Sequence, residues 1–118
     1  MKVIRETEYT QVSVWDEPGA GNACHEYQVK GKQYVDLNPD MCQNINFQNG
    51  PIQENGVNGV QNEDLLAIVI HRLQGFQSGN YYSRYNAIAL TKIEEALMWL
   101  EKRTADRKAR GVEGKSQQ

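Results

Sequence analysis

The chain has 118 residues, of which 39% are hydrophobic and 24% charged, and its formal net charge at pH 7 is −2. This length and composition are typical of one soluble globular domain with a modest core. The slight negative charge argues against a general nucleic-acid binder, because such proteins are usually basic overall.

The charge is unevenly distributed along the chain. Residues 1–60 hold four Lys or Arg and eight Asp or Glu, a net charge of −4, whereas residues 61–118 hold nine and seven, a net charge of +2. Most basic side chains of the second half follow residue 101. This pattern predicts a local patch that attracts anions near the C-terminal end.

The cysteine content and the apolar segments indicate the compartment. The chain has two cysteines, Cys24 and Cys42, and a small secreted domain normally carries more. We therefore expect both thiols to be reduced. The N-terminus has no apolar signal region. The longest strongly apolar run, residues 65–70, is far too short to span a bilayer. We therefore expect a cytoplasmic protein with no membrane partner.

The first part of the chain predicts antiparallel strands. Polar and apolar residues alternate over residues 11–15. Two β-type runs, 25–29 and 33–37, flank Lys30-Gly31-Lys32, which is typical of a hairpin with a short glycine-containing loop. A weaker strand is predicted over residues 41–48.

The second part predicts two helices. Asn62 is expected to cap the first, and Ile68 and Ile70 widen its apolar stripe, so we expect burial on more than one face. Residues 78–80 should end this helix, and the second should run over residues 82–110. The apolar positions follow a bundle-like spacing: Leu65, Leu66, Val69, Leu73 and Phe76 in the first helix, and Leu90, Ile93, Leu97, Leu100 and Thr104 in the second. Met98 and Trp99 lie off that seam, which indicates a second packing surface.

Together these elements predict an α+β fold in a single domain. A small N-terminal antiparallel β-sheet is followed by a C-terminal antiparallel α-hairpin that oligomerises through its helices. Gly111 is expected as the glycine that follows the second helix. The expected segments are the sheet over 1–50, a connection over 51–60, the α-hairpin over 61–111 and a tail over 112–118.

The sequence offers no catalytic or metal-binding constellation. His25 and His71 lack the ligand spacing of a metal site, and neither a nucleophile elbow nor a phosphate-binding loop is present. Glu94 and Glu95 are adjacent, so on a helix they point apart and do not form an acid–base pair. We therefore expect a binding protein rather than an enzyme, with no metal and no cofactor.

Aromatic residues cluster around the turn between the predicted helices. Phe76 could close the hairpin core or stack on a nucleobase. Asn86, just inside the second helix, could be a local cap or could hydrogen-bond a base edge or a ribose. Tyr82 and Arg84, between them in the chain, are further candidate ligand contacts.

Arginines mark the far end of the second helix. Arg103, Arg107 and Arg110 share one helical face, which is either a solvated surface or a clamp for phosphates. Asn86 and Arg103 are separated by about 26 Å of helix, at ~1.5 Å per residue. If both ends serve one small ligand, the site requires a second, antiparallel copy of the chain, and a twofold dimer would hold two such sites.

Several motifs of the second half also resemble a known family. They are Asn62-Glu-Asp-Leu-Leu, Arg72-Leu-Gln-Gly-Phe-Gln-Ser-Gly79, Arg84-Tyr-Asn-Ala87, Glu95-Ala-Leu, Arg103-Thr-Ala-Asp-Arg107 and Arg110-Gly-Val-Glu-Gly114. This half of the chain resembles the helical-hairpin domain of phage anti-CBASS and Thoeris anti-defence sponge proteins. The N-terminal sheet makes the chain similar to the Thoeris branch.

The resemblance implies a phage protein that sequesters immune signalling nucleotides in the infected host cell without degrading them. For the Thoeris branch the ligands are glycocyclic ADP-ribose isomers made by TIR enzymes. The family's stacking aromatic matches Phe76, its asparagine matches Asn86, and its phosphate-contacting arginines match Arg103 and Arg107. The family forms dimers and hexamers, and some members also bind cyclic di- or trinucleotides.

Three other functions remain open from the sequence. The hairpin could serve only as an oligomeric scaffold, the protein could hydrolyse a nucleotide, or it could bind linear nucleic acid. The acidic first half argues against the last of these, since phosphate-driven binding needs positive charge.

Overall fold

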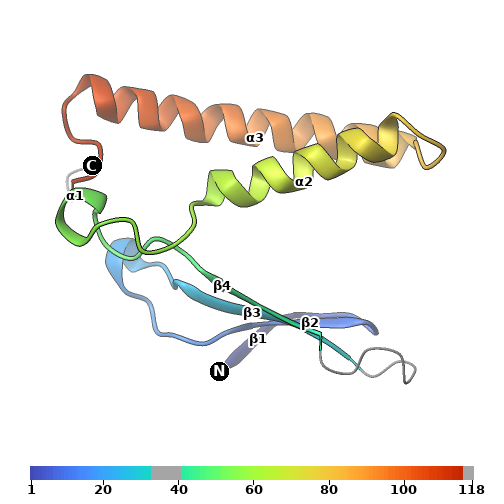
Figure 1. The fold of residues 1–118 in the computed structure, drawn as a ribbon, viewed down its shortest axis with the longest axis horizontal. Coiled ribbons are helices and arrows are strands. Elements are labelled where there is room, and N and C mark those ends of the chain that lie inside the picture. Colours follow the sequence, from blue (N-terminus) through green and yellow to red (C-terminus); the bar gives the residue numbers. More distant parts are fainter. Residues whose placement is uncertain (33–40, 116–118) are drawn as a thin grey trace. The chain divides into compact units, whose positions relative to one another are not determined.

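The computed structural model describes residues 1–32 and 41–115 and forms two compact units, Met1–Val60 and Gln61–Gln118. The first unit contains an antiparallel sheet and the second an α-hairpin (Figure 1). The predicted α+β fold, with the sheet preceding the hairpin, is confirmed. Among the described residues, no helix is long and apolar enough to span a membrane.

The sheet has four strands in the order β1-β2-β3-β4, all antiparallel to their neighbours. Their bounds are β1 Lys2–Glu6, β2 Thr10–Val14, β3 Glu26–Gly31 and β4 Cys42–Asn46. Strand β4 confirms the weak strand expected over residues 41–48. Strand β1 was not singled out from the sequence; all five of its residues are exposed, so its pattern carries little burial signal.

The register divides the sheet into an apolar and a polar face, because side chains directly opposite each other share a face. Tyr27 faces Val14 on one side and Ile45 on the other, and its ring meets Phe47 edge-on at 5.5 Å. On the other face, Gln28 lies between Ser13 and Asn44. The apolar side chains of this sheet therefore lie on the Tyr27 face, whereas the most buried strand residue, Ser13 at 3% exposed, lies on the polar face.

The predicted hairpin around Lys30-Gly31-Lys32 is wrong. Lys30 pairs with Cys42, and the backbone N–H of Gly31 donates to the carbonyl of Met41 at 2.8 Å, so β3 extends into the expected turn. Gly31 also pairs with Thr10 on the opposite side. Gly31 is therefore the last residue of a strand and lies between two partners. The strand expected over 33–37 lies outside the described residues.

Two polar side chains brace the connection after β4. Gln48 bonds the carbonyls of Gly50 and Gly56, and Asn58 pairs with the backbone of Asn49 at 2.8 Å in both directions. This connection includes a one-turn helix, α1 (Ile52–Asn55). Gly59 passes so close to Phe47 that a Cβ would lie 2.5 Å from its carbonyl carbon, so only glycine fits without a backbone shift.

The hairpin consists of α2 (Asn62–Gln77) and α3 (Arg84–Ala109). Asn62 is not the cap as expected: Gln61 precedes the helix, and its backbone N–H donates to the carboxylate of Asp64 at 2.9 Å. Helix α3 begins two residues later than predicted, because the Ser83 hydroxyl accepts the N–H of Asn86 at 3.0 Å. The helix ends as predicted before Gly111, whose φ is +73°.

The contact between the two helices is half-buried rather than sealed. All five predicted seam positions of α3 are half-buried, which confirms that this face meets α2. No residue of α2 is buried, and Ile68 is exposed, so burial of α2 on more than one face is wrong for a single chain. Among the described residues of both units, no hydrophobic side chain is fully buried.

The carboxylate of Asp16 stabilises the sheet unit through hydrogen bonds to the backbone. It accepts the backbone N–H of His25 at 2.9 Å and of Glu26 at 3.1 Å. Desolvation is the largest influence on the pKa of Asp16 and acts to raise it, but the N–H donors of Glu26 and His25 together hold the pKa below its ordinary value. The charged form therefore stabilises the fold above the unfolded-state pKa of about 3.9, and this contribution is lost as pH falls through the lower folded-state value.

We expect Asp16→Ala to lower the free energy of unfolding at neutral pH, because the backbone N–H groups of His25 and Glu26 lose their acceptor. The deficit relative to wild type should shrink at acidic pH. Urea denaturation followed by Trp15 fluorescence in a Trp99→Phe background measures it, with Glu17→Ala as the control. A deficit that stays constant from neutral to acidic pH would contradict the role of the carboxylate.

Candidate functional site

Phe76 lies near the end of α2 and is half-buried. The guanidinium of Arg72, one turn earlier, lies 5.0 Å from its ring centroid, and the ring of Tyr81 meets it edge-on with centroids 6.4 Å apart. These two contacts restrict the orientation of the Phe76 ring. Such a ring can stack on a planar ligand without first being ordered.

Hydrogen bonds tie the turn to both helices. The Asn86 side-chain nitrogen donates to the carbonyl of Tyr81 at 3.4 Å, while Gln77 accepts the N–H of Ser83 at 2.9 Å. The side-chain oxygen of Asn86 has no partner within residues 1–32 and 41–115. Ser83 rather than Asn86 caps α3, so the cap expected at Asn86 is wrong; its side chain instead supports the turn, and its contact with a ligand stays a prediction.

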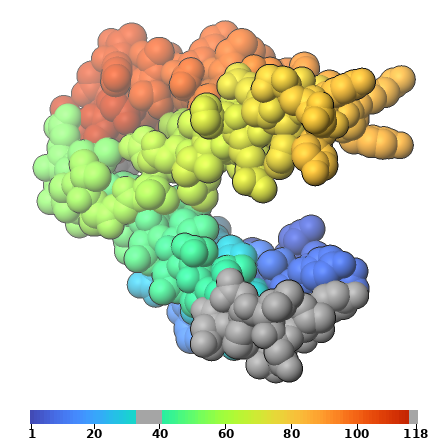
Figure 2. Space-filling view, turned by 45° about the vertical axis from the view of Figure 1, so that its right-hand side comes forward, coloured from blue at the N-terminus to red at the C-terminus, as the bar shows by residue number. Residues whose placement is uncertain are grey.

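Three tyrosines project from the same turn into solvent. Tyr81, Tyr82 and Tyr85 are each at least 71% exposed. Figure 2 shows side chains extending from the end of the hairpin where yellow passes into orange. The structure therefore brings Phe76, Tyr82, Arg84 and Asn86 together at one end, with Arg84 also exposed.

The three arginines at the other end have different environments, although they share one helix. Arg103 is exposed and has no hydrogen-bond or ion-pair partner in the described part of the chain. Arg110 forms an exposed ion pair with Asp106, with Nε 3.0 Å from the carboxylate. Arg107 is only 7% exposed. The sequence spacing alone did not distinguish these three environments.

Arg107 holds the segment that follows α3. Its Nε donates to Glu113 Oε2 at 3.2 Å, and Nη2 donates to the carbonyls of Val112 and Lys115, both at 2.9 Å. The backbone N–H of Val112 donates a hydrogen bond to the carbonyl of Arg107 at 3.0 Å. This guanidinium is therefore engaged within the chain, whereas Arg103 remains available to an anion.

The two groups of candidate residues stay at opposite ends of the hairpin. Asn86 belongs to the first turn of α3 and Arg103 to its last two turns, about 26 Å apart at ~1.5 Å per residue. One chain therefore does not bring Phe76 and Arg103 to one small ligand. Arg72 and Glu113 were not predicted as part of these clusters. The four-residue spacing of Arg72 and Phe76 was a detectable signal, whereas the fold-back to Glu113 was not.

A comparison with known protein families identifies this architecture. The model of the Acb2/Tad1 hairpin domain matches residues 42–105, more than half of the chain. The chain belongs to the Acb2/Tad1 hairpin family. The Acb2/Tad1 match begins at β4 and reaches into α3, so it includes the turn residues and Arg103. Arg107 and Arg110 lie beyond it.

A phage protein of similar sequence supports the assignment. The chain is 64% identical over 70 residues to "Thoeris anti-defense 1" of Bacillus phage SBSphiJ7. The aligned region covers 59% of this chain and 49% of that relative, so the chain spans about half the length of the relative.

Within residues 1–32 and 41–115, no group of three His, Cys, Asp or Glu residues is arranged to hold a metal ion.

The Arg107 contacts generate a stability prediction. Arg107→Ala should lower the free energy of unfolding of the hairpin by about 2 kcal/mol, because it leaves a partly buried Glu113 carboxylate and two carbonyls without their donor. Arg110→Ala removes an exposed pair and should cost under about 0.5 kcal/mol. Chemical denaturation followed by circular dichroism measures both. Equal losses would show that burial of Arg107 has no energetic weight.

Proposed function

We propose that this protein is a phage anti-immune sponge that binds TIR-derived cyclic ADP-ribose signals, namely glycocyclic ADP-ribose isomers, without cleaving them. Sequestration of the signal in the cytoplasm of the infected host would prevent activation of the Thoeris effector. The observation that carries the proposal is the combination, on an Acb2/Tad1 hairpin, of an ordered Phe76 ring at one end with an exposed, unpaired Arg103 at the other.

At the turn, the proposed contacts are to the base and sugar. Phe76 stacks on the adenine, for which its fixed orientation is favourable. The free side-chain oxygen of Asn86 accepts from the base edge or from a ribose hydroxyl. Tyr82 and Arg84 extend this surface because both project from the same turn.

At the far end, the proposed contacts are to phosphate. Arg103 presents its planar donor fork to a phosphate oxygen pair. Arg107 adds buried positive charge while it holds residues 112–115 against α3. Arg110 joins the site when the ligand competes with Asp106 for its guanidinium, an exposed pair that costs little to break.

The two ends meet through assembly. An antiparallel second copy would set its Arg103 beside the Phe76 turn of the first, so that each ligand contacts two chains. The exposed apolar side chains of the hairpin, such as Ile68, Met98 and Trp99, supply a surface for such an assembly. We propose a homo-oligomer, either a dimer or a hexamer, with no DNA or membrane partner and no cofactor.

Calorimetric titration with glycocyclic ADP-ribose tests the proposal. We expect tight binding, and heating the complex should release intact ligand, because a sponge binds the signal without cleaving it. Altered ligand after release would identify an enzyme instead. Absence of binding to this ligand together with binding of cyclic di- or trinucleotides would identify a sponge of different specificity.

The same titration on variants tests the residue roles. Phe76→Ala and Arg103→Ala should each weaken binding about tenfold or more, since a lost base stack is worth about 1–3 kcal/mol and 1.4 kcal/mol is tenfold. Lys92→Ala, an exposed cation in the middle of α3, is the matched control for Arg103 and should leave affinity unchanged. Unchanged affinity in both site variants would favour a simple scaffold.

Assembly is tested by sedimentation. The purified protein should sediment as a dimer or a hexamer, and Trp99→Ser, which removes exposed apolar area from α3, should shift the population toward monomer. Tyr9→Ser, at an exposed aromatic residue of the sheet unit, is the control. A wild-type monomer at the concentrations of the titration would exclude a site shared between chains.

A further inference from the structure

The sheet unit has a polar face that the hairpin site does not use. The register aligns Ser13, Gln28 and Asn44 in one row, and Glu26 lies directly opposite Asn46 in the next. Amide and carboxylate side chains therefore lie next to one another on this face. Because the face is polar, it can remain open to solvent without an apolar penalty.

One aromatic ring borders this polar face in a fixed position. The indole nitrogen of Trp15 donates to the hydroxyl of Ser13 at 2.9 Å, and Ser13 is only 3% exposed. The indole itself remains 52% exposed. The hydrogen bond holds the ring in place while leaving much of its surface available for stacking.

A cavity of about 310 Å³ opens beside this ring. It is lined by Trp15, Glu26, Tyr27, Gln28, Asn44 and Asn46. A second cavity of the same volume shares Glu26 and Asn46 and continues to Asn49. The volume is at the small end of the range of ligand sites, which suits a single nucleoside rather than a larger molecule.

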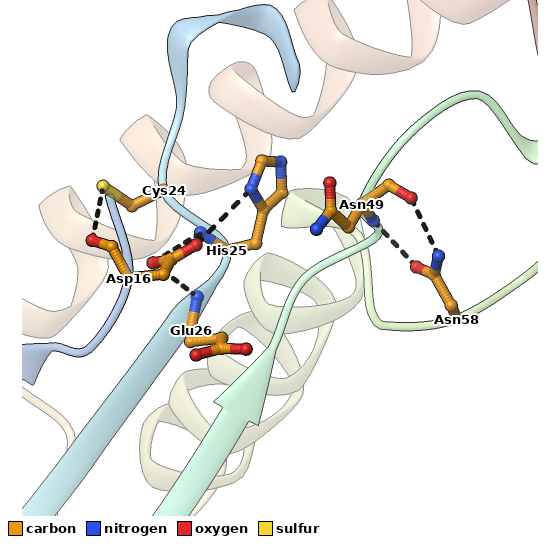
Figure 3. A network of polar contacts seen from close by, with 6 residues as sticks. All are labelled: Asp16, Cys24, His25, Glu26, Asn49 and Asn58. Atoms are coloured by element: carbon orange, nitrogen blue, oxygen red, sulfur yellow. Dashed lines mark hydrogen bonds and ion pairs between the residues drawn. The ribbon is translucent and has the colours of Figure 1, made fainter. Parts of the chain in front are cut away.

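The backbone around the cavities is braced, and two of the lining side chains are bonded to each other, because Gln28 donates to the Asn44 side-chain oxygen at 3.3 Å. Figure 3 shows the carboxylate of Asp16 directed at the backbone of His25 and Glu26, and the amide of Asn58 directed at the backbone of Asn49. Within the described residues, the Glu26 carboxylate and the Asn46 amide have no hydrogen-bond partner. Both side chains are exposed to solvent, so a ligand can reach them on a frame that is already ordered.

We propose that this face binds a ribonucleoside without a phosphate, using residues of the sheet unit alone. The base stacks on the indole of Trp15, as bases do on exposed aromatic rings. The Asn46 amide offers one donor and one acceptor to a base edge, the pairing that asparagine makes with adenine. The Glu26 carboxylate accepts from the ribose hydroxyls, as acidic residues do in dinucleotide sites. The same carboxylate disfavours a phosphate nearby.

Titration of the full-length protein by NMR tests this inference, with adenosine, 2′,3′-dideoxyadenosine and AMP as probes. The chain has two tryptophans, so the indole signal of Trp15 is assigned by its loss in Trp15→Phe. Adenosine should shift this signal and the Asn46 side-chain signal with an affinity of about millimolar, as expected of an open site. Adenosine should bind at least fivefold more tightly than either other probe.

Variants separate the site from the hairpin and from nonspecific stacking. Glu26→Gln should reduce the preference for adenosine over both other probes, and Trp15→Ala should abolish the Asn46 shifts. The response must persist in Phe76→Ala, which removes stacking at the hairpin turn, and in the control variants Tyr9→Ala and Glu17→Gln. No shift of Trp15, shifts confined to Trp99, or equal binding of the three probes would overturn the inference.

Discussion

The organisation of this protein depends on incomplete burial. No hydrophobic side chain is fully buried among the described residues of either unit, so hydrogen bonds and half-buried contacts carry much of the order within one chain. A thin hairpin exposes much of its apolar surface until something covers it. The proposed assembly of several copies would supply that cover, and it would make stability and ligand capacity depend jointly on protein concentration.

The hairpin separates two kinds of chemistry along its length. The turn contains aromatic rings and an amide, whereas the far end contains arginines, and a single chain does not bring them together. Bracing of the turn by Gln77, Ser83 and Asn86 fixes the first group. The segment after α3 is fixed by Arg107. In the proposed site, both ends would be ordered before a ligand arrives, which would limit the entropic cost of binding.

The sequence predicted the elements whose signal is local. Helical spacing located α2 and α3, and Ser78-Gly79-Asn80 identified the break between them. The sequence-based prediction placed a turn at Gly31, where the structure has a strand. Glycine at this position allows the close approach of Met41 and does not form a turn. The prediction also treated Arg103, Arg107 and Arg110 alike. Only the fold-back of Glu113, which follows these arginines by three to ten residues, distinguishes the buried arginine from its exposed neighbours.

The contacts of Arg107 also define where the chain can end. A stop codon or protease cleavage directly after Gly111 would remove the Glu113 carboxylate and the carbonyls of Val112 and Lys115 together. The guanidinium would then lose its acceptors, and the last turns of α3 would fray toward Arg103. Residues 112–115 therefore hold the end of α3 in place, and their removal would disturb the proposed anion-binding end.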